Sequence, residues 1–211
     1  MPLTPDLDRL LIPGARFTDE HGEYLVEAHP VDDIVLPTGR VVGCDPLVCP
    51  EAEPFTVGVA PGRYPARAWV AVVLRDGDEA DRRVAALELV VRDEPVVRWE
   101  MALVDDQDPA TLDDDGFFGY GVDSGTGTLA DPTALAALES WDSERVEDVF
   151  TPAQLPAGPV PSLIAAVTDE ASGANVVTVT SGWGDGGYAT WIGRTADGEV
   201  ASFVTDFTVV P

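Results

Sequence analysis

Ala66-Arg67-Ala68-Trp69-Val70-Ala71-Val72-Val73-Leu74 is almost continuously apolar after Arg67. A run of this kind is typical of a strand that is covered on both faces, in the middle of a sheet. Turn-forming residues follow it in Arg75-Asp76-Gly77-Asp78, and a second strand pattern begins at Arg83. We therefore expect two strands, at residues 64–74 and 83–91, separated by a turn.

Strand patterns also occur on both sides of this pair, at residues 24–28, 40–44, 96–103, 175–181, 188–194 and 200–207. Thr4-Pro5 predicts a short helix that reaches Leu11, with threonine as the N-cap. Asp131-Pro132 is the clearest helix start, and the helical region that it opens is expected to extend to Phe150. Regular alternation of strand and helix is absent, which excludes a doubly wound or barrel layout.

The predicted fold class is α+β. It has mainly antiparallel β-sheets in two strand groups, one principal helix and a short N-terminal helix. Residues 1–211 are expected to form a single domain, because no long flexible linker divides them. The proline-rich loop at 152–161 is interpreted as a rigid loop and as the place for a subdomain seam.

The chain carries 38 acidic and 12 basic residues, for a net charge of −26. This charge discourages binding to nucleic acids and to anionic membranes. It suits a highly soluble protein, a protein from a salty or GC-rich host, or a partner for a basic surface. The first residues lack the pattern of a signal peptide, and no apolar stretch approaches the roughly 20 residues that span a bilayer. We expect a cytoplasmic location.

Several chemistries are excluded by residues that the chain lacks. All 12 basic residues are arginines, so lysine Schiff bases and the lysine of a phosphate-binding P-loop are absent. His21 and His29 are the only histidines, and neither lies near a recognisable nucleophile motif. Cys44 and Cys49 could form a local disulfide, but we favour two buried or free thiols. Activation of Cys44 as a nucleophile would need a nearby base or cation.

Two glycine-rich segments each place a carboxylate among small residues: Gly119-Tyr120-Gly121-Val122-Asp123-Ser124-Gly125-Thr126-Gly127 and Ser181-Gly182-Trp183-Gly184-Asp185-Gly186-Gly187-Tyr188. The first has the wrong spacing for a dinucleotide-binding loop. Both are compatible with ordinary turns. The alternative is a cleft into which these segments direct the oxygens of Asp123, Ser124 and Thr126, with Trp183 and Tyr188 forming a wall beside Asp185.

Other charged residues suggest a second kind of site. Arg98 and Glu100 share one face of a predicted strand, opposite Trp99 and Met101. Together with Arg63 and Arg67, Arg98 could hold a phosphate or carboxylate, while Glu100, Asp123 and Asp185 supply acid–base or metal-ligand oxygens. Asp206 is interpreted either as solvent-facing or as a third acid. The acidic runs at 105–108 and 113–115 do not match a calcium loop and are expected to be solvated.

Several segments in combination resemble one bacterial family, the domain of unknown function numbered 4241. They are Gly39 to Leu47, Pro54-Phe55, Pro61 to Pro65, Pro95 to Ala102, Phe117 to Gly127, Gly173 to Val177, Ser181 to Gly187, and Val204 to Phe207. The resemblance covers about Gly39 to Phe207 and implies no catalytic assignment. The polar signature that it implies comprises Asp45, Arg63, Arg67, Arg98, Glu100, Tyr120, Asp123, Thr126, Trp183, Asp185 and Asp206.

Two functions follow as hypotheses. The first is a binding or interaction module, such as an immunity-type partner of a basic protein, because acidic surfaces accelerate capture of basic partners. The second is a small-molecule-binding protein, for example one for a small anionic ligand, or a metal-assisted hydrolase with an acid–arginine cleft. Whether the chain is an enzyme stays open, and the sequence does not identify a cofactor or decide whether a metal is needed.

Overall fold

The computed structural model describes residues 3, 5–20, 22–155 and 157–211. Its strands form three sheets in which every pairing between neighbours is antiparallel, and its helices are few and short. The predicted α+β class is confirmed. The bounds of the strands and the order of the sheets explain where the cavities of the molecule lie.

The largest sheet has seven strands in the order β1-β2-β4-β5-β13-β12-β6. In that order the strands are Arg16–Asp19, Gly22–Leu36, Gly62–Arg75, Asp78–Val90, Val200–Asp206, Thr190–Arg194 and Arg98–Met101. The apolar run at its centre behaves as expected, because residues 68–73 of β4 are all buried. β4 and β5 form a hairpin whose turn lies at the predicted Arg75–Asp78 position.

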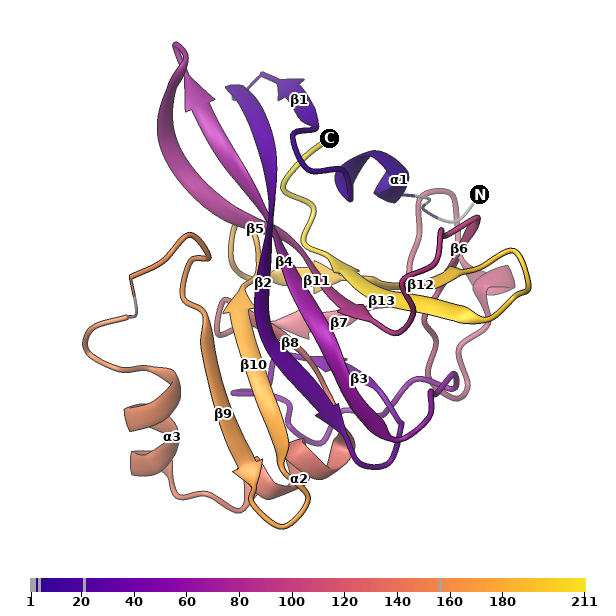
Figure 1. The fold of residues 1–211 in the computed structure, drawn as a ribbon, viewed down its shortest axis with the longest axis vertical. Helices are drawn as coiled ribbons and strands as arrows, with labels where there is room; N and C mark the ends of the chain where they lie inside the picture. The colour runs from indigo at the N-terminus through magenta and orange to yellow at the C-terminus, as the bar shows by residue number, and fades with distance from the viewer. Residues whose placement is uncertain (1–2, 4, 21, 156) are drawn as a thin grey trace.

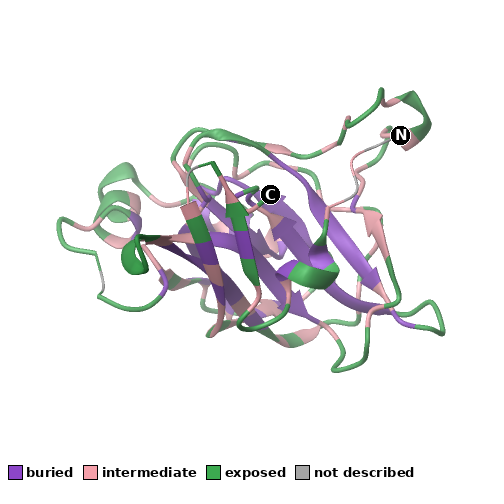
Figure 2. Cartoon of the chain, turned by 90° about the horizontal axis from the view of Figure 1, so that it is seen from above, coloured by how far each residue is buried: buried purple, intermediate pink, exposed green. Residues whose placement is uncertain are grey.

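A second sheet has four strands in the order β3-β8-β10-β9, comprising Val42–Cys44, Thr126–Ala130, Ala174–Thr180 and Ile164–Asp169. One of its faces packs on the large sheet, where Leu129 and Val177 join the same buried cluster as Leu87. Its other face packs against two helices (Figure 1). Figure 2 shows the result, with buried residues along the inner strands and exposed residues in the loops and at the outer helices.

The principal helical region is divided into α2, Pro132–Glu139, and α3, Ser143–Phe150. Asp131 caps α2 as predicted, since its carboxylate accepts a hydrogen bond from the Thr133 amide at 2.8 Å. The break occurs because Asp142 caps a new helix by accepting from the Arg145 amide at 2.8 Å. None of the helices in the described ranges is long and apolar enough to cross a membrane.

The short N-terminal helix is α1, Leu7–Leu10, and its buried residues Leu7 and Leu10 pack on the large sheet. It faces the side of the sheet that is opposite to the four-stranded sheet (Figure 1). Asp6 takes the N-cap position, whereas the predicted cap, Thr4, lies outside the described residues. His21 and Pro156, a residue of the predicted 152–161 loop, lie outside them as well.

Candidate functional site

The two glycine-rich segments pair with each other. β7, Tyr120–Val122, and β11, Gly186–Tyr188, form a two-stranded antiparallel sheet in which Tyr120 lies opposite Tyr188. Glycine is required at position 119, because a Cβ there would lie 2.3 Å from the Tyr188 carbonyl oxygen. From the sequence, each segment is interpreted as a separate turn. No local pattern indicates that the two segments pair with each other.

A buried carboxylate fixes the first glycine-rich segment. Asp45 is fully buried and accepts hydrogen bonds from the amides of Asp123 at 3.0 Å and Ser124 at 2.7 Å. It also accepts from the Ser124 hydroxyl at 2.7 Å and from the Leu47 amide at 3.1 Å. Bonding to four donors satisfies a carboxylate that burial would otherwise penalise. Asp45 is therefore the anchor of this turn, and the Asp123 side chain itself is exposed.

The second glycine-rich segment is closed by its own residues. The Tyr188 hydroxyl lies 3.0 Å from the Ser181 carbonyl oxygen and 2.7 Å from that of Gly184. Asp123 directly follows Val122, and Asp185 directly precedes Gly186, the partner of Val122 in the ladder. These two exposed residues therefore adjoin the same end of the ribbon. Each segment thus contains a short strand of the ribbon and an adjoining turn, as in the ordinary-turn interpretation.

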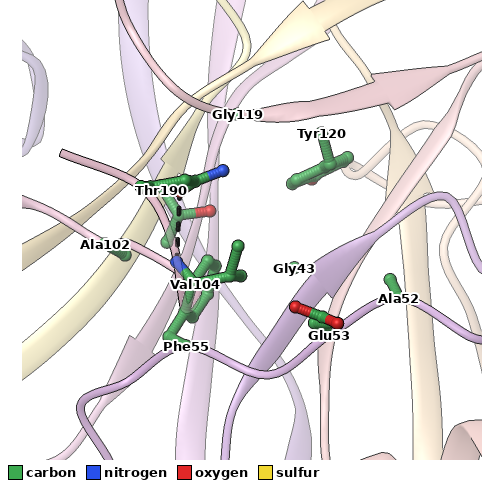
Figure 3. A pocket seen from close by; sticks show the side chains of 10 residues that line it. Gly43, Ala52, Glu53, Phe55, Ala102, Val104, Gly119, Tyr120 and Thr190 are labelled. Carbon is green, nitrogen blue, oxygen red and sulfur yellow. Dashed lines mark hydrogen bonds between the residues drawn. The ribbon is translucent and has the colours of Figure 1, made fainter. Parts of the chain in front are cut away.

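A cavity of about 240 Å³ lies beside this ribbon, between β3, β7 and the start of β12. Figure 3 shows Thr190, Val104 and Phe55 on one side of it, with Tyr120, Gly43 and Glu53 on the other. The residues that line it are Gly43, Ala52, Glu53, Phe55, Ala102, Val104, Gln107, Gly119, Tyr120 and Thr190.

The inner part of this cavity is mainly apolar. Phe55 stacks on Phe203 with ring centroids 6.1 Å apart, and burial raises the pKa of Tyr120. A Cβ on Gly43 would lie 3.0 Å from an atom of each of Phe55, Tyr120 and Thr190. The absence of a side chain at position 43 therefore leaves the cavity open.

The polar groups of the cavity lie toward its rim. Glu53 is exposed, and Figure 3 shows its carboxylate at the cavity. The Val104 amide donates to Gln107 Oε1 at 3.1 Å, which leaves the amide N–H groups of Gln107 for other partners. A carboxylate and a side-chain amide above an apolar floor can hold a group that has an apolar body and a polar or cationic end.

Most of the predicted site residues lie elsewhere, and Tyr120 alone among them lines this cavity. Arg63 pairs with Asp33 at 4.0 Å, Arg67 with Glu88 at 3.7 Å, and Arg98 with Glu100 at 3.1 Å. Glu100 also pairs with Arg194 of β12, so the three side chains form an ion-pair cluster that joins β12 to the edge strand β6. The predicted shared face of Arg98 and Glu100 is consistent with their contact.

The remaining predicted residues lie at three further places. Thr126 hydrogen-bonds Ser124 at 2.8 Å, and Trp183 is an exposed side chain with Arg83 4.9 Å from its ring centroid. Asp206 is half-buried and accepts from the Thr208 amide at 2.8 Å, and burial raises its pKa to about 6. The structure therefore distributes the candidate residues over several surfaces.

The cysteines are thiols, as favoured from the sequence. Cys44 is buried, and this burial raises the pKa of its thiol, which disfavours the reactive thiolate. Across the described ranges of the chain, no three or more His, Cys, Asp or Glu side chains are grouped so that they could hold a metal ion.

Sequence reasoning missed most of the cavity. Glu53, Gln107 and Thr190 carry no motif, and they meet only because three distant segments fold together. Gly43, Phe55 and Ala102 lie in segments that had been singled out, but their spacing along the chain does not predict a shared cavity. A deliberate search for small residues beside aromatic ones could have suggested Gly43.

A family model described as "Protein of unknown function (DUF4241)" matches residues 34–205, which confirms the resemblance. The searches of curated proteins and of solved structures gave no match. Five cavity residues, Gly43, Phe55, Ala102, Gly119 and Tyr120, fall within the segments that carry the resemblance.

Proposed function

The chain belongs to the DUF4241 family, and we propose that it is a binding module that captures a basic protein partner through the acidic rim of the cavity beside β7. An acidic immunity protein that neutralises a basic toxin would be an interaction of this kind. The observation that carries the proposal is an excess of unpaired carboxylates around that cavity.

Arginines elsewhere are largely neutralised by acids of the same chain. Examples are Arg67 with Glu88, Arg92 with Glu199, and Arg194 with Glu100. A surface on which arginines are paired and acids are in surplus attracts cations and repels anions. This supports a basic partner over a small anionic ligand.

The rim of the cavity carries several of the surplus acids. Glu53 lines it, Glu51 is two residues away, and Asp105 and Asp106 lie between the lining residues Val104 and Gln107. All four acids are exposed, and among the described residues none of them forms an ion pair with an arginine. Like charges gathered in this way accelerate association with a partner of opposite charge.

The cavity would supply what the acidic rim lacks, a place for an anchoring side chain. Interfaces depend on a few side chains that fill desolvated pockets, with charged groups around them. An apolar floor beneath Glu53 suits an arginine or a long apolar side chain of the partner, whose cationic end would remain near the rim.

An acid–arginine cleft, used by a small-molecule binder or a metal-assisted hydrolase, is the alternative. An anion at Arg63, Arg67 or Arg98 would have to compete with the carboxylate that each already contacts. We also propose a cytoplasmic location for the binding module. The two free thiols support it, because thiols persist in a reducing compartment.

The test compares two variants with the same change of net charge. The rim variant carries Glu51→Gln, Glu53→Gln, Asp105→Asn and Asp106→Asn. Its control carries four neutralised acids at exposed positions elsewhere: Asp93→Asn, Glu94→Gln, Glu170→Gln and Asp197→Asn. Affinity purification at low salt is expected to recover the same basic protein with the wild type and the control, and to lose it with the rim variant.

Titration calorimetry with that purified partner then measures the affinity directly. We expect the rim variant to bind at least about tenfold more weakly, and the affinity of the wild type to fall as salt increases. Equal binding by the rim variant and the control would overturn the proposal, as would recovery of no basic partner by the wild type.

A further inference from the structure

A second cavity, of about 440 Å³, lies on the other side of the large sheet, under α1. It shares no lining residue with the cavity beside β7. Apolar residues of the N-terminal segment form one wall. The residues that give the second cavity its chemical character are Asp8, Arg67, Trp69, Glu88 and Trp99.

The sheet register explains why these groups meet. Arg67 of β4 lies directly opposite Glu88 of β5, so both side chains project from the same face. Trp69 is two residues beyond Arg67 and shares that face. Trp99 reaches the same side from the edge strand β6, on the face that is opposite to Arg98 and Glu100.

Glu88 is the most unusual member of this group, because it is a carboxylate that is only 7% exposed. Its Oε2 accepts from Trp69 Nε1 at 2.9 Å and lies 3.7 Å from Arg67 Nη1. Its Oε1 has no hydrogen-bond partner among the described residues. This oxygen is not among the fully buried atoms that lack a partner, so it is accessible from the cavity and can accept a hydrogen bond from a ligand.

Asp8 and Trp99 repeat the same arrangement at the other end of the cavity. Trp99 Nε1 donates to Asp8 Oδ1 at 2.9 Å. Each indole N–H therefore orients one carboxylate, and each carboxylate keeps its second oxygen for another partner. Burial raises the pKa of Glu88, whereas the Trp69 indole N–H and Arg67 favour its charged form. With both carboxylates ionised, two negative charges face one guanidinium and the cavity carries a net negative charge.

A buried hydroxyl lies next to the wall of this cavity. Ser202 Oγ has no hydrogen-bond partner within the described chain. A Cβ placed on Gly193 would lie 3.1 Å from Ser202 Oγ. It would also lie 2.7 Å from the Val96 side chain and 3.0 Å from the Trp99 side chain, so the three groups surround the same point. Val96 and Trp99 both line the cavity. The Ser202 hydroxyl beside this wall therefore makes no hydrogen bond to the described residues of the chain.

We propose that this cavity binds a small organic ammonium cation that carries an apolar or aromatic body. Glu88 and Asp8 supply the counter-charge, and the indoles of Trp69 and Trp99 favour a cation through the negative charge of their ring faces. The apolar wall from α1 receives the body of the ligand. A volume of about 440 Å³ falls within the usual range of small-molecule sites.

This inference does not depend on the proposed protein partner, because the two sites lie on different sides of the sheet. An anion is disfavoured at Arg67 by the adjacent Glu88 and by the overall charge of −26. A neutral ligand of the same shape would fill the space but would not compensate the one negative charge that Arg67 leaves unbalanced.

Titration calorimetry with three matched probes tests the inference: phenethylammonium, the neutral 2-phenylethanol and the anionic phenylacetate. We expect phenethylammonium to bind at least about tenfold more tightly than 2-phenylethanol, with phenylacetate weakest. Equal affinity for the three probes, or no binding of phenethylammonium, would overturn the inference.

Variants locate the site. Glu88→Gln keeps an acceptor for Trp69 but removes the charge, and it should weaken phenethylammonium binding at least about tenfold. Asp8→Asn, at an exposed position, should weaken it as well and serves if Glu88→Gln does not fold. Glu170→Gln, in the exposed turn between β9 and β10, is the matched control and should bind as the wild type does. Unchanged binding by both Glu88→Gln and Asp8→Asn, or weakening by Glu170→Gln as large as theirs, would contradict the assignment.

Discussion

At the scale of single residues, the most consequential side chain of the glycine-rich region is Asp45, which lies far from it in sequence. Replacing Asp45 with alanine removes the acceptor of four part-buried hydrogen bonds and leaves a cavity at a fully buried position. We expect the free energy of unfolding to fall by about 2–4 kcal/mol, measured by urea denaturation.

The exposed residue Asp123 provides the control for that experiment. Asp123→Ala should change the free energy of unfolding by less than about 0.5 kcal/mol, because its carboxylate lies at the surface. An equal loss of stability in both variants would show that the Asp123 side chain contributes as much as Asp45, which contradicts the role assigned to Asp45.

Asp206 gives a prediction about pH. Its pKa of about 6 in the folded protein lies above the roughly 3.9 expected for an unfolded aspartate. The folded state therefore binds more protons between these values, and its stability falls as pH rises from about 4 to about 6. Above that range the contribution is constant.

Asp206→Asn should remove the pH dependence of stability that comes from Asp206, while keeping an acceptor for the Thr208 amide. The stability of the wild type relative to the variant is expected to fall by roughly 1–3 kcal/mol across that interval, as measured by thermal unfolding at several pH values. A constant difference between the two proteins would show that the carboxyl group titrates normally.

At the scale of elements, the hairpin of β4 and β5 combines a buried centre with an exposed tip. Residues 68–73 are buried, whereas 75–80 are exposed or lie in the turn. Native-state hydrogen exchange should find the amides of 68–73 among the slowest in the chain and those of the tip among the fastest. Uniform exchange along β4 would contradict the view that this strand is the centre of the sheet.

The elements that the sequence predicts well are those with a strong local pattern. The apolar run that ends at Leu74 and the capping pair Asp131-Pro132 both give the expected strand and helix. The sequence predicts one helical region up to Phe150 and does not predict the break between α2 and α3. The segment between them, Ser140-Trp141-Asp142, contains no proline or glycine, and the second helix is marked only by the N-cap that Asp142 forms.

Partners that are distant in sequence could not be predicted in this way. The pairing of Tyr120 with Tyr188 depends on tertiary structure, since periodicity identifies a strand but not its neighbour. The same reason explains the two cavities. Arg67 was singled out, but Glu88 had no motif, and only the register of β4 against β5 places it beside Arg67.

At the scale of the whole molecule, we propose that residues 1–211 form one domain. The four-stranded sheet contributes Leu129 and Val177 to one apolar cluster, and Ala130 and Val176 to the other. Both clusters therefore depend on the same strands. We expect a single unfolding transition with equal calorimetric and van't Hoff enthalpies. Two resolved transitions would support a seam at the loop of residues 152–161.

The order of the large sheet also affects how the protein can form while it is being synthesised. β13, Val200–Asp206, lies between β5 and β12, although it is the last of these strands to leave the ribosome. Until then, β5, whose C-terminal half becomes buried in the folded protein, has an open edge, and such edges invite pairing with other chains. Nascent chains that stall before Val200 should therefore be more prone to aggregate than those that have added β13.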